Sequence, residues 1–404
     1  MDVRVIIILC LEALLCMLIL YRTGVIKQNR IFLWAAALTA VSFGLREICL
    51  SHETLDYLDF LKNWVQFFRD NGGFKALQYP IGNYNIPYLY FLALFSYSGI
   101  YDLYLIKLLS ILFDILLAWG VMNLVSLYTK SKTKKLVAFF LPLFCPTVIL
   151  NGSLWGQCDS IYAALAVWAV WYGLRGKGIP AMVFMALSFG FKLQAVFIMP
   201  VFVALWYSGK IEFKHFWIFP LTYVLLVLPA VLLGRPFFDT ISLYFSQTGS
   251  IGDGLNYNSP SVFGIFDTAA NLKVASTLGI IAAFVWMFAV LLIAYMKRDS
   301  LDNLNLLLIA SLLCIGIPFL LPHMHDRYFF VADVITLVLA VVDLRLIPAA
   351  VLTQLASLLS YYAYLTMRYF SIGHTVFTMN YGAWLLIFVL IYLSVYLYAC
   401  MKEE

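Results

Sequence analysis

The run LDYLDFLKNW places two carboxylates beside a stretch of aromatic residues. A carboxylate at a membrane surface can act as a general base toward a hydroxyl group. Asp56 directly precedes the aromatic stretch and is therefore our candidate base. Asp59 lies about one helical turn further on and is expected to face solvent. The alternative for both is a solvated loop acid without a catalytic role.

The motif HMHDR (323–327) is a candidate phosphate site. Arg327 presents a fork of donors that matches phosphate oxygens, and His323 and His325 can add to it. Anchoring of the chain at the membrane interface is one alternative. A His-x-His metal site is another, although no carboxylate cluster at suitable spacing supports it. Asp326 would favour the dipole of a helix that we expect to start here.

Further polar residues interrupt the apolar runs. The motif WGQCD (155–159) opens an apolar helix, where Asp159 can cap the helix or hold a basic partner. Lys192 lies at a tight turn and is expected either to bind an anionic head group or to extend toward the interface. Asp114 is expected to be paired, with Lys107 as the candidate partner. The remaining candidates for contact with a substrate or its phosphate are Asn83, Tyr84, Asn85, Trp155, Gln157, Gln194, Arg235 and Arg368.

The elements that position these residues are predicted to be membrane-spanning helices. Hydrophobic residues make up 64% of the 404 positions and charged residues 12%, whereas about a quarter of a soluble domain is charged. Lipid must therefore be the solvent for most of the surface. The modest net charge of +5 gives no indication of a nucleic-acid partner. The cysteines lie mostly in apolar runs without a CxxC pair, which favours buried hydrophobes over disulfides or a zinc site.

The apolar segments predict an all-α, polytopic transmembrane helix bundle of about 13 spans, with residues 1–404 forming a single domain. A span needs about 20 apolar residues, and several segments are shorter than that. We interpret 179–208 as two short helices, although one kinked helix is the alternative. The predicted spans are 4–21, 31–49, 103–127, 136–151, 158–174, 179–191, 194–208, 215–233, 275–296, 303–321, 328–342, 346–363 and 382–400.

Basic residues distinguish the two sides of this bundle. Fifteen of the 26 Lys and Arg residues fall in short segments that the positive-inside rule places in the cytoplasm. The N-terminus and two long loops, 50–102 and 234–274, are then external. Within the first loop, 59–73 and 86–99 are predicted to form helices at the outer interface. The candidate site residues all meet on the external face in this topology.

Five motifs together resemble the C-type, multi-membrane-spanning glycosyltransferases, in particular the bacterial relatives of the second mannosyltransferase of GPI-anchor synthesis. The motifs occur in family order over residues 50–330. The family's HMHER stretch is HMHDR here, which keeps the charge, and Ile86 stands where a second proline is often found. The motifs are DYLDFLKNW with GGF (56–74), NYNIPYLY (83–90), WGQCD (155–159), FKLQ (191–194) and HMHDRYFF (323–330).

The resemblance implies an inverting transfer of a sugar from a polyprenyl-phosphate donor to a hydroxyl group at the outer face of the membrane. Asp56 would be the base. Phosphate leaves as a stable anion, so one base and a cationic clamp suffice, in contrast to the two carboxylates of most glycosidases. Arg327 and His325, with Lys192 or Arg368, would hold the phosphate as its charge develops.

The expected partners are the polyprenyl-phosphate sugar, a glycan or lipid-linked acceptor, and membrane lipids. The expected location is the bacterial cytoplasmic membrane. No cofactor is expected, and the involvement of a divalent metal stays open. Two other functions also stay open, a transporter or flippase of lipid-linked sugars and a non-catalytic partner in envelope assembly. Transporters usually carry charge near the bilayer midplane and contain internal repeats, neither of which we find, so the enzyme is favoured.

Overall fold

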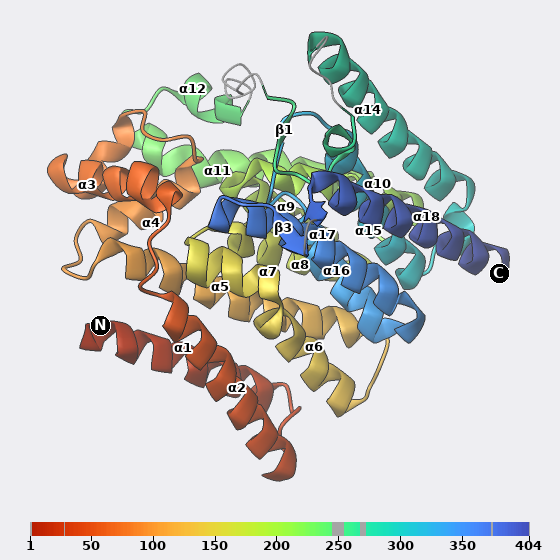
Figure 1. Cartoon of the computed structure of the whole chain (residues 1–404), viewed down its shortest axis with the longest axis horizontal. Coiled ribbons are helices and arrows are strands. Elements are labelled where there is room, and N and C mark those ends of the chain that lie inside the picture. Colours follow the sequence, from red (N-terminus) through yellow and green to blue (C-terminus); the bar gives the residue numbers. More distant parts are fainter. Residues whose placement is uncertain (1, 28, 245–253, 267–271, 373–374, 404) are drawn as a thin grey trace. The chain divides into compact units, whose positions relative to one another are not determined.

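The computed structural model describes residues 2–27, 29–244, 254–266, 272–372 and 375–403, and its regular structure is almost entirely helical (Figure 1). Each of the thirteen predicted segments contains helix. Among these described residues, eight helices are long and apolar enough to cross a membrane, or nine if the bent pair 132–155 is one span. The all-α polytopic bundle is therefore confirmed, whereas the number of spans stays a prediction.

The chain divides into two compact units, which we describe separately. The first unit contains residues 1–168, 182–193 and 217–250, and the second contains 169–181, 194–216 and 251–404. The prediction of one domain over residues 1–404 stays a prediction.

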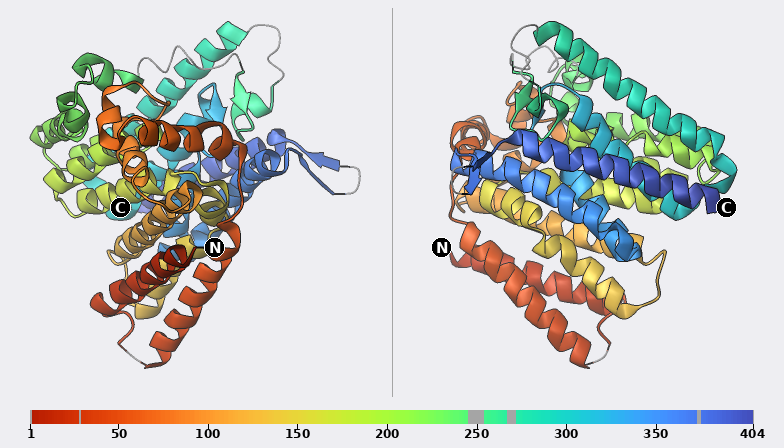
Figure 2. Two further views of the ribbon diagram at one scale, coloured as in Figure 1. Left: turned by 90° about the vertical axis from the view of Figure 1, so that its left-hand side faces the viewer. Right: turned by 45° about the vertical axis from the view of Figure 1, so that its right-hand side comes forward.

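In the first unit, α1 packs on both α2 and α5, and α5 packs on α6 (Figures 1 and 2). Proline sets the bend after α6, because Pro146 begins a new helical turn directly after Cys145. The helices of this unit are α1 (Val3–Arg22), α2 (Asn29–Cys49), α3 (Lys62–Asp70), α4 (Ile86–Phe95), α5 (Asp102–Val125), α6 (Lys132–Phe144), α7 (Pro146–Ile149), α11 (Ile218–Leu232) and α12 (Phe237–Ile241), with most of α8 (Asp159–Leu174) and α9 (Gly178–Phe191).

The first long loop contains both helices predicted for it. A π-helical turn at Tyr57–Leu61 leads into α3, which ends where Gly72 and Gly73 take φ values of +80° and +64°. A side chain at Gly73 would collide with Tyr97. The second helix, α4, is largely enclosed by protein, since seven of its ten residues are buried, and its place at or dipping into the outer interface stays a prediction. It packs against α3, α5 and α11, which cover its apolar sides.

In the second unit, the buried helix α15 (Asn303–Leu320) is the centre, and α14 (Leu272–Met296), α16 (Phe330–Val342) and α18 (Met379–Glu403) all pack on it (Figure 1). Helix α17 (Ile347–Thr366) packs on α16 and α18. The remaining elements of this unit are α10 (Val201–Tyr207) and two short strand pairs, β1 (Asn256–Tyr257) with β2 (Met324–His325) and β3 (Phe370–Ile372) with β4 (Thr375–Phe377).

Two local predictions can be compared directly with these elements. Segment 179–208 is two helices, as predicted, because α9 ends at Phe191 and the next helical turn begins at Leu193. The helix predicted at 328–342, after HMHDR, is α16, which begins at Phe330. The pairing of Met324 and His325 with β1, just before this helix, was not predicted.

Candidate active site

Asp56 lies where the first long loop enters its π-helical turn, and the residue is partly exposed. Its Oδ2 accepts hydrogen bonds from Trp155 Nε1 at 2.8 Å and from Gln157 Nε2 at 2.5 Å. The Oε1 atom of Gln157 accepts in turn from the hydroxyl group of Tyr84 at 3.0 Å. Four of the predicted site residues, from three separate stretches of the chain, therefore form one hydrogen-bonded cluster.

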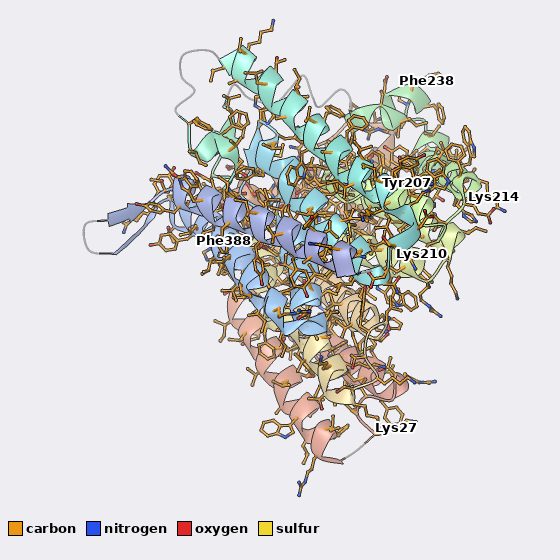
Figure 3. All side chains as sticks on the ribbon, turned by 90° about the vertical axis from the view of Figure 1, so that its right-hand side faces the viewer. Lys27, Tyr207, Lys210, Lys214, Phe238 and Phe388 are labelled. Atoms are coloured by element: carbon orange, nitrogen blue, oxygen red, sulfur yellow. The ribbon has the colours of Figure 1, made fainter. Side chains whose placement is uncertain are left out.

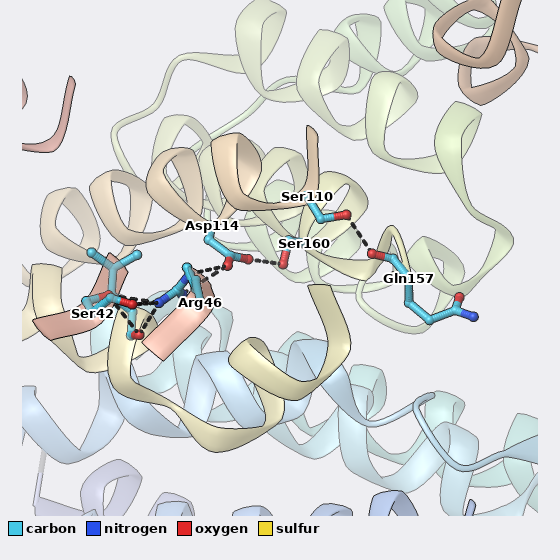
Figure 4. Close-up of polar contacts among 7 residues, drawn as sticks. Ser42, Arg46, Ser110, Asp114, Gln157 and Ser160 are labelled. Atoms are coloured by element: carbon cyan, nitrogen blue, oxygen red, sulfur yellow. Dashed lines mark hydrogen bonds and ion pairs between the residues drawn. The ribbon is translucent and has the colours of Figure 1, made fainter. Parts of the chain in front are cut away.

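The WGQCD loop that holds Asp56 is itself fixed by backbone contacts. Gly156 adopts a φ of +81°, a conformation that favours glycine, and this turns the chain between the π-helical turn 150–155 and α8. Thr54 Oγ1 donates to the carbonyl oxygen of Trp155 at 2.9 Å. Ser110 Oγ donates to the carbonyl oxygen of Gln157 at 2.7 Å, as Figure 4 shows. The donors to Asp56 are therefore placed by α5 and by the segment just before Asp56.

Lys107 fixes the start of the Asp56 loop. Its side chain is buried, and its ammonium group donates to the carbonyl oxygens of Cys49, Leu50 and His52 at 2.9, 3.1 and 2.6 Å. Cys49 is the last residue of α2, and Leu50 and His52 lie within the next three residues. A cation is favourable here because the last carbonyls of a helix lack partners within it. The predicted pairing of Lys107 with Asp114 was wrong.

Asp114 instead forms a fully buried ion pair with Arg46 of α2, with Arg46 Nη2 at 2.9 Å from its Oδ2 (Figure 4). The guanidinium group also donates to the carbonyl oxygen of Leu143 at 2.8 Å, and Ser160 Oγ donates to Asp114 Oδ1 at 2.5 Å. This network joins α2, α5 and α8 to the end of α6. It therefore holds together the helices that carry the Asp56 loop and the WGQCD motif.

Asp159 and Lys192 form a second buried ion pair beside the Asp56 cluster. Asn151 Nδ2 also donates to Asp159, at 2.7 Å, and the Lys192 ammonium lies 5.8 Å from the centre of the Tyr84 ring and 6.0 Å from that of Tyr162. The prediction that Asp159 holds a basic partner is confirmed. Lys192 does not extend to the interface, because its side chain is 8% exposed.

The NYN stretch contains residues of different kinds. Asn83 is exposed, whereas Asn85 is fully buried. Asn85 caps α4 by accepting from the backbone N–H of Ile86 at 2.8 Å, and it donates to the Tyr223 hydroxyl group at 3.0 Å. Asn85 is therefore placed to orient α4, and its burial makes a direct substrate contact unfavourable.

The HMHDR motif belongs to the second unit. His325 stacks on Tyr257, with ring centres 4.7 Å apart. His323 has a φ of +61°, and its Nδ1 lies 2.7 Å from the carbonyl oxygen of Gly254. Arg327 is largely buried, with one guanidinium nitrogen 3.5 Å from a carboxylate oxygen of Asp326. The motif is thus a rigid turn that presents two imidazoles and a guanidinium group.

The remaining candidates are Arg235, in the first unit, and Gln194 and Arg368, in the second. Arg235 is buried and donates to the carbonyl oxygen of Tyr79 at 3.1 Å, and this burial lowers the pKa of its guanidinium group. Gln194 Oε1 is buried without a hydrogen-bond partner among the described residues, and Arg368 is exposed just before β3. Asp59 is exposed, as predicted. Within the described ranges, no three His, Cys, Asp or Glu side chains are grouped so that they could hold a metal ion.

Three residues that hold the site in place were not predicted from the sequence, namely Thr54, Ser110 and Arg46. For Lys107, the predicted partner was wrong. A signal for Ser110 and Lys107 is present. Lys107, Ser110 and Asp114 recur at spacings of three and four residues in an otherwise apolar helix, which puts them on one face. This polar face of α5 indicates a buried attachment point for other polar segments.

Comparison with known proteins supports the predicted enzyme class. Residues 91–208 match the family described as "Alpha-(1->6)-mannopyranosyltransferase, N-terminal domain". The match contains WGQCD and FKLQ, but it leaves out Asp56 and HMHDR. No curated protein matches the chain significantly. The predictions of glycosyltransferase activity and of a likeness to the C-type mannosyltransferases are confirmed by this similarity.

Proposed function

We propose that the chain is an inverting hexosyltransferase that moves a sugar from a polyprenyl-phosphate donor to a hydroxyl acceptor at the outer face of the membrane. Mannose is the first candidate for this sugar. The observation that carries this proposal is the attachment of Asp56 to Trp155 and Gln157. Two donors on one carboxylate oxygen fix the direction of a partly exposed acid, which general-base catalysis requires. A solvated loop acid has no need of such attachment.

In this reaction the acceptor oxygen attacks the anomeric carbon of the donor while the bond from that carbon to the phosphate oxygen breaks. Asp56 takes the proton of the acceptor hydroxyl group, and polyprenyl phosphate leaves as an anion. Because inversion changes the anomeric configuration, an α-linked product requires a β-linked donor. We assign binding of the donor phosphate to Arg327, His325 and His323 on the chemistry of their side chains.

In this proposal Lys192 does not bind the donor phosphate directly, because it is paired with Asp159. Its ion pair with Asp159 holds a positive charge beneath the rings of Tyr84 and Tyr162. A fixed positive charge close to the base site favours developing negative charge on the departing phosphate. Tyr84 is partly exposed and Asn83 is exposed, so both are candidates for contact with the sugar, whereas Gln157 is 3% exposed and acts by holding Asp56.

The test uses purified full-length chain with β-linked polyprenyl-phosphate mannose and a cell-envelope extract as the source of acceptor. Release of polyprenyl phosphate is measured for the wild type, Asp56→Asn and Asp59→Asn. Loss of a general base lowers the rate by about 10²–10⁴-fold, so Asp56→Asn should fall by this factor. Asp59→Asn is the matched control, since it removes the same charge from an exposed position in the same loop.

Two results would contradict the proposal. If Asp56→Asn keeps wild-type turnover while it folds normally, Asp56 is not the base. If no polyprenyl-phosphate sugar is consumed, but a lipid-linked sugar changes leaflet in vesicles that contain the chain, the protein is a transporter.

A further inference from the structure

A cavity of about 320 Å³ lies in the second unit between α14 and α18. Both helices pack on α15, and Leu312 of α15 forms part of the lining (Figure 1). Most of the other lining residues are apolar or aromatic, such as Trp286 and Tyr398. The volume falls within the range of small-molecule pockets, at its lower end.

One wall of this cavity is rigid. Trp286 Nε1 donates to the carbonyl oxygen of Leu312 at 3.0 Å, which fixes the indole ring against α15. The ring packs on Gly316, where a Cβ atom would come within 2.0 Å of Nε1. Glycine at this position therefore lets α14 place an aromatic ring directly on the backbone of α15. The shape of this wall is therefore set by the packing of α14 on α15.

Positive charge is concentrated in the lining at the ends of the two helices. Lys297 directly follows the last residue of α14, and Lys402 lies in the last turn of α18. Both are exposed and both line the cavity, in which Ser394 is another polar residue. The distribution of basic residues predicts that these helix ends are cytoplasmic. The cavity thus has apolar walls and, at the end predicted to face the cytoplasm, two lysine side chains.

The sides of α14 and α18 suit contact with lipid. Both helices are long and apolar enough to span a membrane, and only about a third of each is buried. Phe288 of α14 and Phe388 of α18 are exposed, and Phe388 is labelled on α18 in Figure 3. The two helices that border the cavity thus present apolar outer sides, which suits contact with acyl chains.

We propose that this cavity binds one anionic phospholipid of the inner leaflet. Its acyl chain lies against Trp286 and Leu312, and its phosphate contacts Lys297 and Lys402. The apolar walls select a hydrocarbon chain, and the paired cations select a negative head group over a zwitterionic one. This proposal is independent of the glycosyltransferase reaction, because it uses none of the residues assigned to that reaction.

The test titrates purified full-length chain in detergent with phosphatidylglycerol or phosphatidylcholine and counts the bound lipids by native mass spectrometry. A lysine near an anionic surface contributes about fivefold in affinity. The double variant Lys297→Gln/Lys402→Gln should therefore bind phosphatidylglycerol about 25-fold more weakly. Lys297→Arg/Lys402→Arg keeps the charge and should keep most of the binding.

Two further variants separate the cavity from general surface charge. Lys130→Gln/Lys132→Gln removes two exposed basic charges that do not line the cavity, and it should bind like the wild type. Ala289→Phe fills the cleft while it leaves both lysines in place, and it should also lose phosphatidylglycerol. The proposal is overturned by equal binding of both phospholipids, by equal losses in the two Lys→Gln variants, or by a preference for polyprenyl phosphate over phosphatidylglycerol.

Discussion

Gln157 offers the sharpest test of how Asp56 is held. Its amide group is 3% exposed, donates to Asp56 Oδ2 and accepts from the Tyr84 hydroxyl group. Gln157→Leu keeps most of the volume and removes the donor. A hydrogen bond to a charged group contributes about 1.5–3 kcal/mol, and 1.36 kcal/mol corresponds to a tenfold change in rate. We therefore expect kcat to fall roughly 10- to 150-fold, with a smaller effect on KM for the donor.

The assay is the release of polyprenyl phosphate, measured for the wild type, Gln157→Leu, Asp56→Asn and the double variant. If Gln157 acts through Asp56, its loss should matter little once the carboxylate is gone, and the two effects will be strongly non-additive. A Gln157→Leu penalty that is the same in both backgrounds would refute this reasoning. A change confined to thermal stability, with kcat unaltered, would show instead that the bond only supports the fold.

Three further predictions concern other parts of the chain. Lys107→Met removes the donor that Leu50 and His52 share with Cys49, whose carbonyl oxygen also accepts from the backbone N–H of His52. An unsatisfied buried acceptor costs about 1–3 kcal/mol, so the melting temperature of this variant in detergent should fall clearly, and an unchanged value would contradict the assigned role. The hydrogen bond from Arg345 holds the pKa of Asp343 below its usual range. The ion pair therefore contributes to stability above the ordinary pKa of aspartate, and this contribution is lost as the pH falls through the lowered pKa of Asp343. When the pH is lowered below about 4, the melting temperature of Asp343→Asn should consequently fall less than that of the wild type. Single cysteines at Asp56 and His325, in a chain without its native cysteines, should both react with an impermeant maleimide from outside, and opposite sidedness would contradict the topology.

Apolar length and spacing were sufficient to predict the helices. All thirteen predicted segments contain helix, and the break at Lys192 is where the sequence indicated it. The position of Asp159 at the start of an apolar helix was also informative. It predicted either a helix cap or a basic partner, and Asp159 has a basic partner, Lys192, which lies 33 residues away. The helices depend mainly on local chemistry, which the sequence contains, whereas the identity of this partner does not.

The pairing of the buried charges could not be predicted in the same way. Lys107 and Asp114 lie on the same helix, and neighbouring opposite charges on a helix face are a reasonable pair. In the structure each has a better partner in α2 or just after it. Lys107 donates to the carbonyl oxygens of Cys49, Leu50 and His52, and Asp114 pairs with the guanidinium group of Arg46. Because these partners lie more than fifty residues away, their choice follows from helix packing, which the spacing does not contain. The turn structure of HMHDR likewise depends on pairing with a distant strand.

The buried charges beneath Asp56 also explain why its loop can be ordered at all. A partly exposed loop has little apolar area to bury, so hydrophobic packing alone holds it weakly. Arg46, Lys107 and Lys192 come from three different stretches of the chain, and all three are buried. Lys107 contacts carbonyl oxygens just before Asp56, Arg46 pairs with Asp114 of α5, and Lys192 pairs with Asp159 of the WGQCD motif. Removing one partner of a buried pair costs about 3–5 kcal/mol, because the other charge stays uncompensated. Any other arrangement of these segments would leave some of the charges buried without a partner, which is still less favourable. The pairing of the charges thus fixes the segments, and the segments fix the direction of the Asp56 carboxylate.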